Sequence, residues 1–374
     1  MKLLLITSEY TGHGHKSIST ALSEQFSLYP DVEVDVQDGF RFVGEAGVRM
    51  SKFYGPMTRR AKEMWRIVYA FSDKSASAMA EILAVGMKDR LSAYLEKNRP
   101  DMIVTVHSMF NGSVINALES LGWDIPVVVV QADLINIHST WCDPRAYRTI
   151  CMTPEAQSAT LCQGVPPSRV VVGSFPIRQI FSQAAMNRPH PPYTGQGSFH
   201  CLIASGGEGS GNLRKYAEKL LSRFDCRVTV LCGRNQRLKK SLEEDLWEYS
   251  HRLTALGFVS NMQDYIADAD LMIARGSPNT LMEAVVCGTP LIITGALPGQ
   301  EAENPALFAR HGLGVCCEST SDLTAVVRDL MADNARKLAD IRAAQQAYRN
   351  LNSARDDADY IVRLCREYLQ NKKR

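Results

Sequence analysis

The chain has 374 residues, of which 45% are hydrophobic and 22% are charged, and its formal net charge at pH 7 is +2. This length exceeds what a single hydrophobic core usually serves, so it predicts a globular protein of two domains. The near balance of charge argues against general nucleic-acid binding. The ten cysteines include no CxxC pair, which argues against a zinc site or a disulfide framework and indicates a reducing compartment.

The N-terminal stretch MKLLLITSEY contains an apolar run that is too short for a signal peptide, and it predicts a first strand. No apolar run approaches the ~18 residues that a membrane-spanning helix needs. We therefore expect a cytoplasmic protein, with possible attachment to a membrane surface.

Short apolar strands alternate with amphipathic helices along nearly the whole chain. Strands are predicted at 2–8, 32–38, 101–107 and 125–133, and the apolar runs are continuous enough to be buried on both faces. This pattern is typical of a parallel sheet with crossover helices. After the proline-rich segment 186–199 the same order restarts, with a strand, a glycine-rich loop and a helix at 213–224.

The predicted fold is therefore α/β, with two Rossmann-like, doubly wound domains that face each other across a ligand cleft. We expect domains at 1–185 and 200–353, joined by a linker at 186–199. The last helix, at 354–374, has no strand after it and is expected to pack back on the first domain.

The glycine-rich loop SEYTGHGHKSISTAL, at 8–22, follows the first predicted strand directly. Loops of this kind usually hold phosphates, but His13 and His15 are bulky for that role. A dehydrogenase is one alternative, with Asp35 or Asp38 as the ribose-binding acid. The second half of the chain, however, shows no pattern for hydride transfer.

The segment 268–304 contains the strongest ligand-binding pattern in the residues themselves. A predicted strand ends at Gly276, Ser277 is a good N-cap, and Pro278 takes the first helical position. A helix N-terminus at the end of a parallel strand favours an anion, and Thr280 adds a hydroxyl. Taken alone, the pattern also fits a capped core helix followed by a polar loop.

Two acidic residues just before that strand mimic the DxD motif with which some enzymes bind a metal. Asp268 and Asp270 precede the strand, at the end opposite the expected cleft. We therefore expect a surface turn there and predict no metal site.

Several motifs, in order along nearly the whole chain, resemble one family. The first half contains GHGHKS (12–17), QADLINIHSTW (131–141) and GSFPIRQIF (173–181). The second half contains LCGRNQRLKKSL (231–242), GFVSNMQDYIADADLMI (257–273), RGSPNT (275–280) and PGQEAEN (298–304). Together they resemble the diacylglycerol sugar transferases of glycosyltransferase family 28, which have the GT-B fold.

The resemblance implies an inverting, metal-independent hexosyltransferase that moves a sugar from a UDP-hexose to a hydroxyl of a lipid such as diacylglycerol. It places the general base at His15, the acceptor in the first domain and the UDP-sugar in the second. The donor-binding residues that we expect are Gly14, Gly206, Gly207, Arg234, Phe258, Val259, Ser277, Pro278, Thr280, Glu283, Gln300, Glu301 and Asn304. Those expected on the acceptor side are His13, Asp133, His138 and Trp141.

The sequence departs from the family pattern at Asn279, where relatives have glycine, so the phosphate contacts of this turn stay open. The pattern leaves the hexose undetermined. Two alternatives share the donor site: a transferase that acts on a soluble acceptor, and a sensor that binds a UDP-sugar without turning it over.

Residues 49–71 interleave basic and aromatic side chains, with a single acidic residue among them. Such a stretch suits an anionic membrane surface, and we expect membrane contacts at Arg59, Arg60, Trp65 and Arg66. The alternative is an ordinary amphipathic helix that packs on the first domain. With the family resemblance, the expected location is the inner face of the cytoplasmic membrane.

Overall fold

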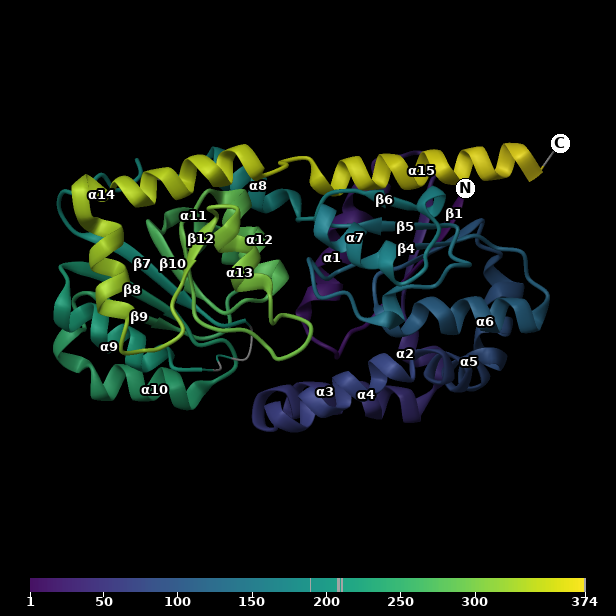
Figure 1. Cartoon of the computed structure of the whole chain (residues 1–374), viewed down its shortest axis with the longest axis horizontal. Coiled ribbons are helices and arrows are strands. Elements are labelled where there is room, and N and C mark those ends of the chain that lie inside the picture. The colour runs from purple at the N-terminus through teal and green to yellow at the C-terminus, as the bar shows by residue number, and fades with distance from the viewer. Residues whose placement is uncertain (189, 207–208, 210, 373–374) are drawn as a thin grey trace. The chain divides into compact units, whose positions relative to one another are not determined.

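The computed structural model describes residues 1–188, 190–206, 209 and 211–372, with side chains throughout except at 13, 54, 56, 58–60 and 62. The chain divides into two compact units. Unit 1 comprises Met1–Arg178, Pro298–Gln300 and Asn352–Arg374, and unit 2 comprises Gln179–Leu297 and Glu301–Leu351. Each unit contains a six-stranded sheet with flanking helices (Figure 1).

The sheet of unit 1 has the strand order β2-β1-β3-β4-β5-β6, and every pairing is parallel. Its strands are β1 (Lys2–Thr7), β2 (Glu33–Asp38), β3 (Met102–Thr105), β4 (Val127–Val130), β5 (Arg148–Cys151) and β6 (Val170–Val172). Its helices are α1 (His13–Phe26), α2 (Gly39–Val43), α3 (Glu45–Arg60), α4 (Lys62–Lys74), α5 (Ala76–Asn98), α6 (Asn111–Leu121), α7 (Pro154–Cys162) and α15 (Ser353–Lys372).

The sheet of unit 2 has the order β12-β11-β10-β7-β8-β9 and is also parallel throughout. Its strands are β7 (Phe199–Ala204), β8 (Cys226–Leu231), β9 (Leu253–Leu256), β10 (Leu271–Ala274), β11 (Leu291–Ile293) and β12 (Gly314–Cys316). Its helices are α8 (Gln179–Met186), α9 (Leu213–Arg223), α10 (Gln236–Asp245), α11 (Met262–Asp268), α12 (Pro278–Cys287), α13 (Asn304–Arg310) and α14 (Leu323–Tyr348).

Burial explains why these runs form central strands. Leu3, Leu4, Leu5 and Ile6 of β1 are at most 1% exposed, and the four valines of β4 are at most 4% exposed, because helices cover both faces of the sheet. The loops between strands and helices contain more polar side chains than the strands do.

Each sheet has a topological switch point, where the chain changes direction across the sheet. In unit 1 it lies between β1 and β3, and in unit 2 between β7 and β10. Loops that leave adjacent strands here turn to opposite faces, which opens a crevice at the carboxyl ends of the strands. The glycine-rich loop that leads into α1 and His15 follows β1, and the turn at Gly276–Pro278 follows β10, so both predicted site segments start at a switch point.

Helix α15 follows unit 2 in the chain but packs in unit 1, where it lies alongside α1 (Figure 1). Asp357 of α15 is buried and accepts a hydrogen bond from the Ser174 backbone N–H, at 3.2 Å. The Ser353 hydroxyl accepts one from the backbone N–H of Ile177. The carboxylate of Asp357 comes so close to Gly173 that this position has no room for a side chain.

Some local predictions need correction. The first helix begins at His13, within the stretch 8–22 described above as a loop, and the stretch 49–71 is broken into two helices at Ala61. The turn with Asp268 and Asp270 is not a solvated surface turn. Asp270 is 5% exposed and accepts hydrogen bonds from the backbone N–H groups of Tyr193 and His200, so it fixes the proline-rich segment to unit 2.

Within the described ranges, we find no helix that has both the length and the apolar character needed to cross a bilayer.

Candidate active site

His15 lies in the first turns of α1, directly after the glycine-rich loop. Its Nδ1 lies 2.7 Å from the backbone oxygen of Val106, which can only accept, so Nδ1 carries the proton and donates it. The ring is then the neutral tautomer whose Nε2 keeps its lone pair, and Nε2 has no hydrogen-bond partner among the described residues. Burial lowers the pKa of His15 to about 4. The geometry therefore presents a neutral imidazole base.

A second histidine, which the sequence analysis did not single out, lies beside it. His107 follows β3 and is 5% exposed, and its ring centroid is 4.3 Å from that of His15. Its Nε2 lies 2.9 Å from the hydroxyl of Thr11, a residue of the glycine-rich loop. The feature of the sequence that could have identified His107 is its position at the end of a predicted strand. In the structure this strand neighbours the first one in the sheet.

Two of the predicted acceptor-side residues meet close to His15. The Trp141 ring lies 6.2 Å from that of His15, and Trp141 Nε1–H donates to Asp133 Oδ2 at 2.6 Å. Trp141 is buried and therefore acts as a wall of the site. The side chain of His13 lies outside the described residues.

Both ring nitrogens of His138 have hydrogen-bond partners outside this cluster. Its Nδ1 lies 2.8 Å from the Thr140 hydroxyl, and its Nε2 lies 3.0 Å from the Ser72 hydroxyl of α4. Asp73 of the same helix accepts a hydrogen bond from the backbone N–H of Ser139. His138 and Ser139 therefore fasten α4 to the loop that carries Trp141.

In unit 2, the turn after β10 leads directly into α12. Ser277 has extended backbone angles and Pro278 follows at the first helical position, but the Ser277 hydroxyl makes no capping hydrogen bond. The first amide groups of a helix lack partners within it, and the helix dipole adds positive potential there. The N-terminus of α12, with Thr280 in its first turn, thus has the character of an anion site.

Asn279, the departure from the family pattern, lies in this turn. Its side-chain nitrogen is buried and has no hydrogen-bond partner among the described residues. An unsatisfied donor of this kind is costly, so a ligand oxygen at the N-terminus of α12 would find an additional donor here.

Two residues of the polar loop 298–304 fix the conformation of that loop through hydrogen bonds to the protein. Glu301 is 3% exposed, and its oxygens accept hydrogen bonds from Arg275 at 3.3 Å and from the backbone N–H of Leu297 at 2.8 Å. Asn304 is fully buried and donates to the backbone oxygen of Gly276. Both buried side chains therefore fix the segments that surround the N-terminus of α12.

The remaining predicted donor residues are distributed as follows. Glu283 is 8% exposed in α12, Phe258 is 58% exposed with Arg234 stacked 5.5 Å from its ring, and Val259 is half-buried. Gly206 has a left-handed φ of 65° after β7, Gly14 lies in α1, and Gln300 is grouped with unit 1. Gly207 lies outside the described residues.

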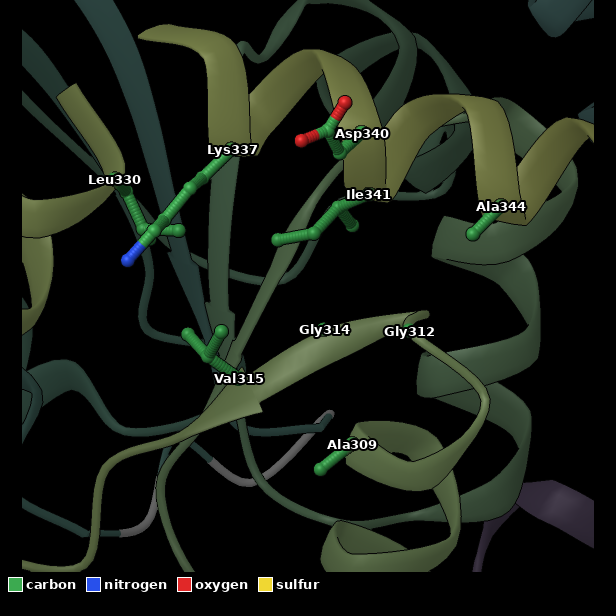
Figure 2. Close-up of a pocket in the computed structure, with 9 residues that line it drawn as sticks. All are labelled: Ala309, Gly312, Gly314, Val315, Leu330, Lys337, Asp340, Ile341 and Ala344. Carbon is green, nitrogen blue, oxygen red and sulfur yellow. The ribbon is translucent and has the colours of Figure 1, made fainter. Parts of the chain in front are cut away.

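A pocket of about 280 Å³ lies elsewhere in unit 2 and contains none of these residues. It is lined by Ala309, Gly312, Gly314, Val315, Leu330, Lys337, Asp340, Ile341 and Ala344. Figure 2 shows Lys337 and Asp340 on α14 above the start of β12, at the opposite end of the strands from the α12 N-terminus. In the described part of the chain, no cluster of three or more His, Cys, Asp or Glu side chains is arranged to hold a metal ion.

The predicted membrane contacts are only partly described. Arg66 is exposed and pairs with Glu63 at 3.1 Å, while the side chains of Arg59 and Arg60 lie outside the described residues. Trp65 is half-buried, and its ring centroid lies 6.0 Å from that of Tyr69, one turn further along α4. The outward face of α4 is apolar instead, and consists of Met64, Ile67, Val68 and Phe71.

Two family models match the chain, one in each half. The model described as monogalactosyldiacylglycerol (MGDG) synthase matches residues 15–177, and that described as glycosyltransferase family 28 C-terminal domain matches residues 200–358. The probable monogalactosyldiacylglycerol synthase 2, chloroplastic, of Oryza sativa subsp. japonica is 29% identical over 84% of this chain and 70% of that protein. The processive diacylglycerol beta-glucosyltransferase of Bacillus licheniformis is 26% identical over 99% of this chain and 97% of that protein.

Solved structures share the fold at lower identity. Acinetobacter baumannii MurG has a TM-score of 0.66 and 15% identity, and the match covers 97% of this chain and all of that one. Staphylococcus aureus MnaA, solved with UDP, has a TM-score of 0.64 and 13% identity, over 99% and 97% of the two chains.

Two Rossmann-like units, each with its site segment at a switch point, are the architecture of the GT-B fold. The chain belongs to glycosyltransferase family 28, and the family and fold class predicted from its motifs are both confirmed. It is a hexosyltransferase.

Proposed function

We propose that this enzyme transfers a hexose from a UDP-sugar to a hydroxyl group of diacylglycerol, with inversion at the anomeric carbon. The observation that carries the proposal is the neutral His15, whose Nε2 lone pair is kept available by the Nδ1–H bond to Val106. The named activities of the relatives in rice and Bacillus supply the substrate classes, a galactose or glucose unit and a diacylglycerol.

In the proposed reaction, Nε2 of His15 takes the proton of the acceptor hydroxyl as its oxygen attacks the anomeric carbon. The new C–O bond forms on the face opposite the breaking bond to UDP, so an α-linked donor gives a β-linked product. The N-terminus of α12 stabilises the negative charge that grows on the leaving diphosphate. This assigns acceptor binding to unit 1 and donor binding to unit 2, and no step to a metal.

The residues of the donor site take roles that follow their placement. We propose that Ser277, Pro278, Asn279 and Thr280 contact the diphosphate, while Glu283 binds the ribose. The uracil ring would lie near Phe258 and Val259, and Gln300 would reach the sugar. Glu301 and Asn304 then act on the sugar chiefly by holding their loop, since both carboxylate oxygens of Glu301 and the side-chain nitrogen of Asn304 already hydrogen-bond to the protein.

We propose further that α4 attaches the enzyme to the cytoplasmic face of a membrane that holds its acceptor. Met64, Ile67, Val68 and Phe71 are between 39% and 72% exposed and lie on one side of this helix, and the exposed Lys74, seven residues after Ile67, lies on the same side. An apolar helix face with a basic neighbour suits the interface of an anionic bilayer. On its other side, α4 is fastened to the loop of Trp141, so a docked membrane would adjoin the acceptor side of the site.

The test is UDP release from a panel of UDP-hexoses, with and without vesicles that contain diacylglycerol, followed by product mass and anomeric configuration. Turnover that requires the vesicles and gives a β-glycolipid supports the proposal. Turnover with a soluble alcohol alone would identify a soluble-acceptor transferase, and UDP-sugar binding without turnover would identify a sensor. His15→Ala should lower kcat by about 10²–10⁴-fold while UDP binding persists, because UDP contacts unit 2.

A further inference from the structure

His107 holds a position that the proposed mechanism does not yet use. It lies just beyond β3, across the switch point of unit 1 from the loop that leads into α1 and His15. Val106, the residue before it, accepts the Nδ1–H bond of His15, and the His107 ring contacts the same imidazole at 4.3 Å between centroids, with a tilt of 46°. Two consecutive residues therefore contact one proposed base from two directions.

The hydrogen bonds of His107 assign its tautomer. The backbone N–H of Met109 donates to Nδ1 at 3.3 Å, so Nδ1 is unprotonated and the proton is on Nε2. Nε2–H then donates to the Thr11 hydroxyl at 2.9 Å. Both nitrogens are occupied within unit 1, so His107 has neither a proton acceptor nor a donor to offer a substrate.

Aromatic neighbours keep the ring in this orientation. Phe40 meets it edge-on at 5.6 Å and Phe110 lies 5.1 Å away, and the side chain is almost fully buried. Because burial and the nearby His15 both lower the pKa of His107, its ring stays neutral. A neutral neighbour adds no like-charge repulsion when His15 gains a proton during the reaction.

We infer that His107 is a positioning residue: it holds the His15 imidazole and the Thr11 segment of the glycine-rich loop in the geometry that aims Nε2 of His15 at the acceptor hydroxyl. This inference rests on the proposed role of His15 as the base. Without the His107 ring, His15 can rotate away from Val106, and without the bond to Thr11, the loop that precedes α1 loses its link to the end of β3.

Two substitutions separate the parts of this arrangement. His107→Phe keeps an aromatic ring but loses both hydrogen bonds, whereas Thr11→Val keeps the shape of its side chain and removes only the acceptor for Nε2–H. We expect each to lower kcat by about 10-fold or more, with the KM for the UDP-sugar changed by less than about threefold, since misplacement of a reacting group acts on the chemical step. Thr11→Ser, which retains the hydroxyl, should restore kcat.

Unit 2 offers a matched control. His200 Nε2 lies 2.9 Å from the Thr229 hydroxyl, and this pair is as buried as the pair of His107 and Thr11, but both residues lie within strands, His200 next to the amino end of β7 and Thr229 inside β8. Thr229→Val therefore removes the same kind of bond without touching the site, and it should leave kcat unchanged.

A spectroscopic measurement reports positioning directly. In protein labelled with ¹⁵N-histidine, His15 should show a protonated Nδ1 and an unprotonated Nε2. In His107→Phe and Thr11→Val we expect a mixture of the two tautomers at His15, an effect that simple loss of stability does not produce.

The outcomes are distinguishable. If His15→Ala retains activity, the proposed base is wrong, whatever the other variants do. If His15→Ala loses activity while His107→Phe and Thr11→Val keep kcat within about threefold and the His15 tautomer unchanged, the positioning role is overturned and the base stands. An equal loss in Thr229→Val would also overturn it, because the effect would then be general destabilisation.

Discussion

His15 is neutral before it reacts, because burial holds its pKa at about 4 in the free protein. A base is active in its unprotonated form, so kcat/KM should stay level from about pH 8 down to about pH 5.5 and fall only as the pH approaches that pKa. Initial rates at low donor concentration, with binding to the vesicles checked at each pH, measure this profile. An acidic limb centred near pH 6.5 would show that the base is an ordinary exposed histidine instead.

Glu301 illustrates how a residue of the sugar-binding loop can act through structure. Glu301→Ala leaves Arg275 and the Leu297 amide without their acceptor, which should cost about 1–3 kcal/mol of unfolding free energy and raise the KM for the UDP-sugar. Urea unfolding and donor saturation curves measure the two effects. Glu303→Ala, at an exposed position of the same loop, is the control, and equal unfolding midpoints for the two variants would contradict the structural role.

Features of the candidate site that depend on neighbouring residues can be predicted from the sequence, and features that depend on residues far apart in the chain cannot. Glycines around His15 and the Ser-Pro start of α12 are short-range patterns with known geometry, so both segments were predicted. The contact of His107 with Thr11 joins residues 96 positions apart, and only the strand order of the sheet brings them together. Glu301 and Asn304 were recognised as polar, but burial, which decides what they contact, depends on the packed loop.

Among the elements, α4 has two distinct faces, one toward the loop of His138 and one apolar and exposed. If the exposed face enters a membrane, Ile67→Glu or Phe71→Glu should weaken binding to anionic vesicles about tenfold or more, since burying one such side chain contributes about 1.5–3 kcal/mol. Vesicle sedimentation measures the binding. Leu28→Glu is the matched control, because Leu28 and Ile67 are each 67% exposed. Unchanged binding of both α4 variants would remove α4 from the membrane interface.

The strands were predicted well because their apolar runs are buried on both faces, so their positions do not depend on fine detail. The boundaries of the helices depend, in addition, on packing between elements. No pattern of residues indicates that 49–71 divides at Ala61, whose backbone angles are not helical, or that Asp270 is buried against the proline-rich segment. Such breaks and anchors follow from packing between elements rather than from the residues of one element.

At the scale of the molecule, the buried Asp357 of the last helix makes the free energy of unfolding depend on pH. Desolvation raises its pKa to about 8, so between about pH 4 and pH 8 the folded protein holds a proton that the unfolded chain has released. Asp357 therefore makes stability fall as the pH rises through this range. Asp357→Asn, which still accepts from the Ser174 amide, should flatten that dependence in urea unfolding between pH 5 and pH 8. The same slope in both proteins would mean that Asp357 is ionised when folded.

The return of α15 to unit 1 also has a consequence for biosynthesis. During translation, the first 178 residues emerge without the helix that covers α1 and Gly173, and all of unit 2 must be made before that helix appears. Domains generally fold as they emerge, N-terminal first, so unit 2 is expected to complete its fold while unit 1 still exposes an uncovered surface. In this enzyme the unit that carries the proposed base would be completed only after unit 2 has been made, which ties the appearance of activity to the synthesis of α15.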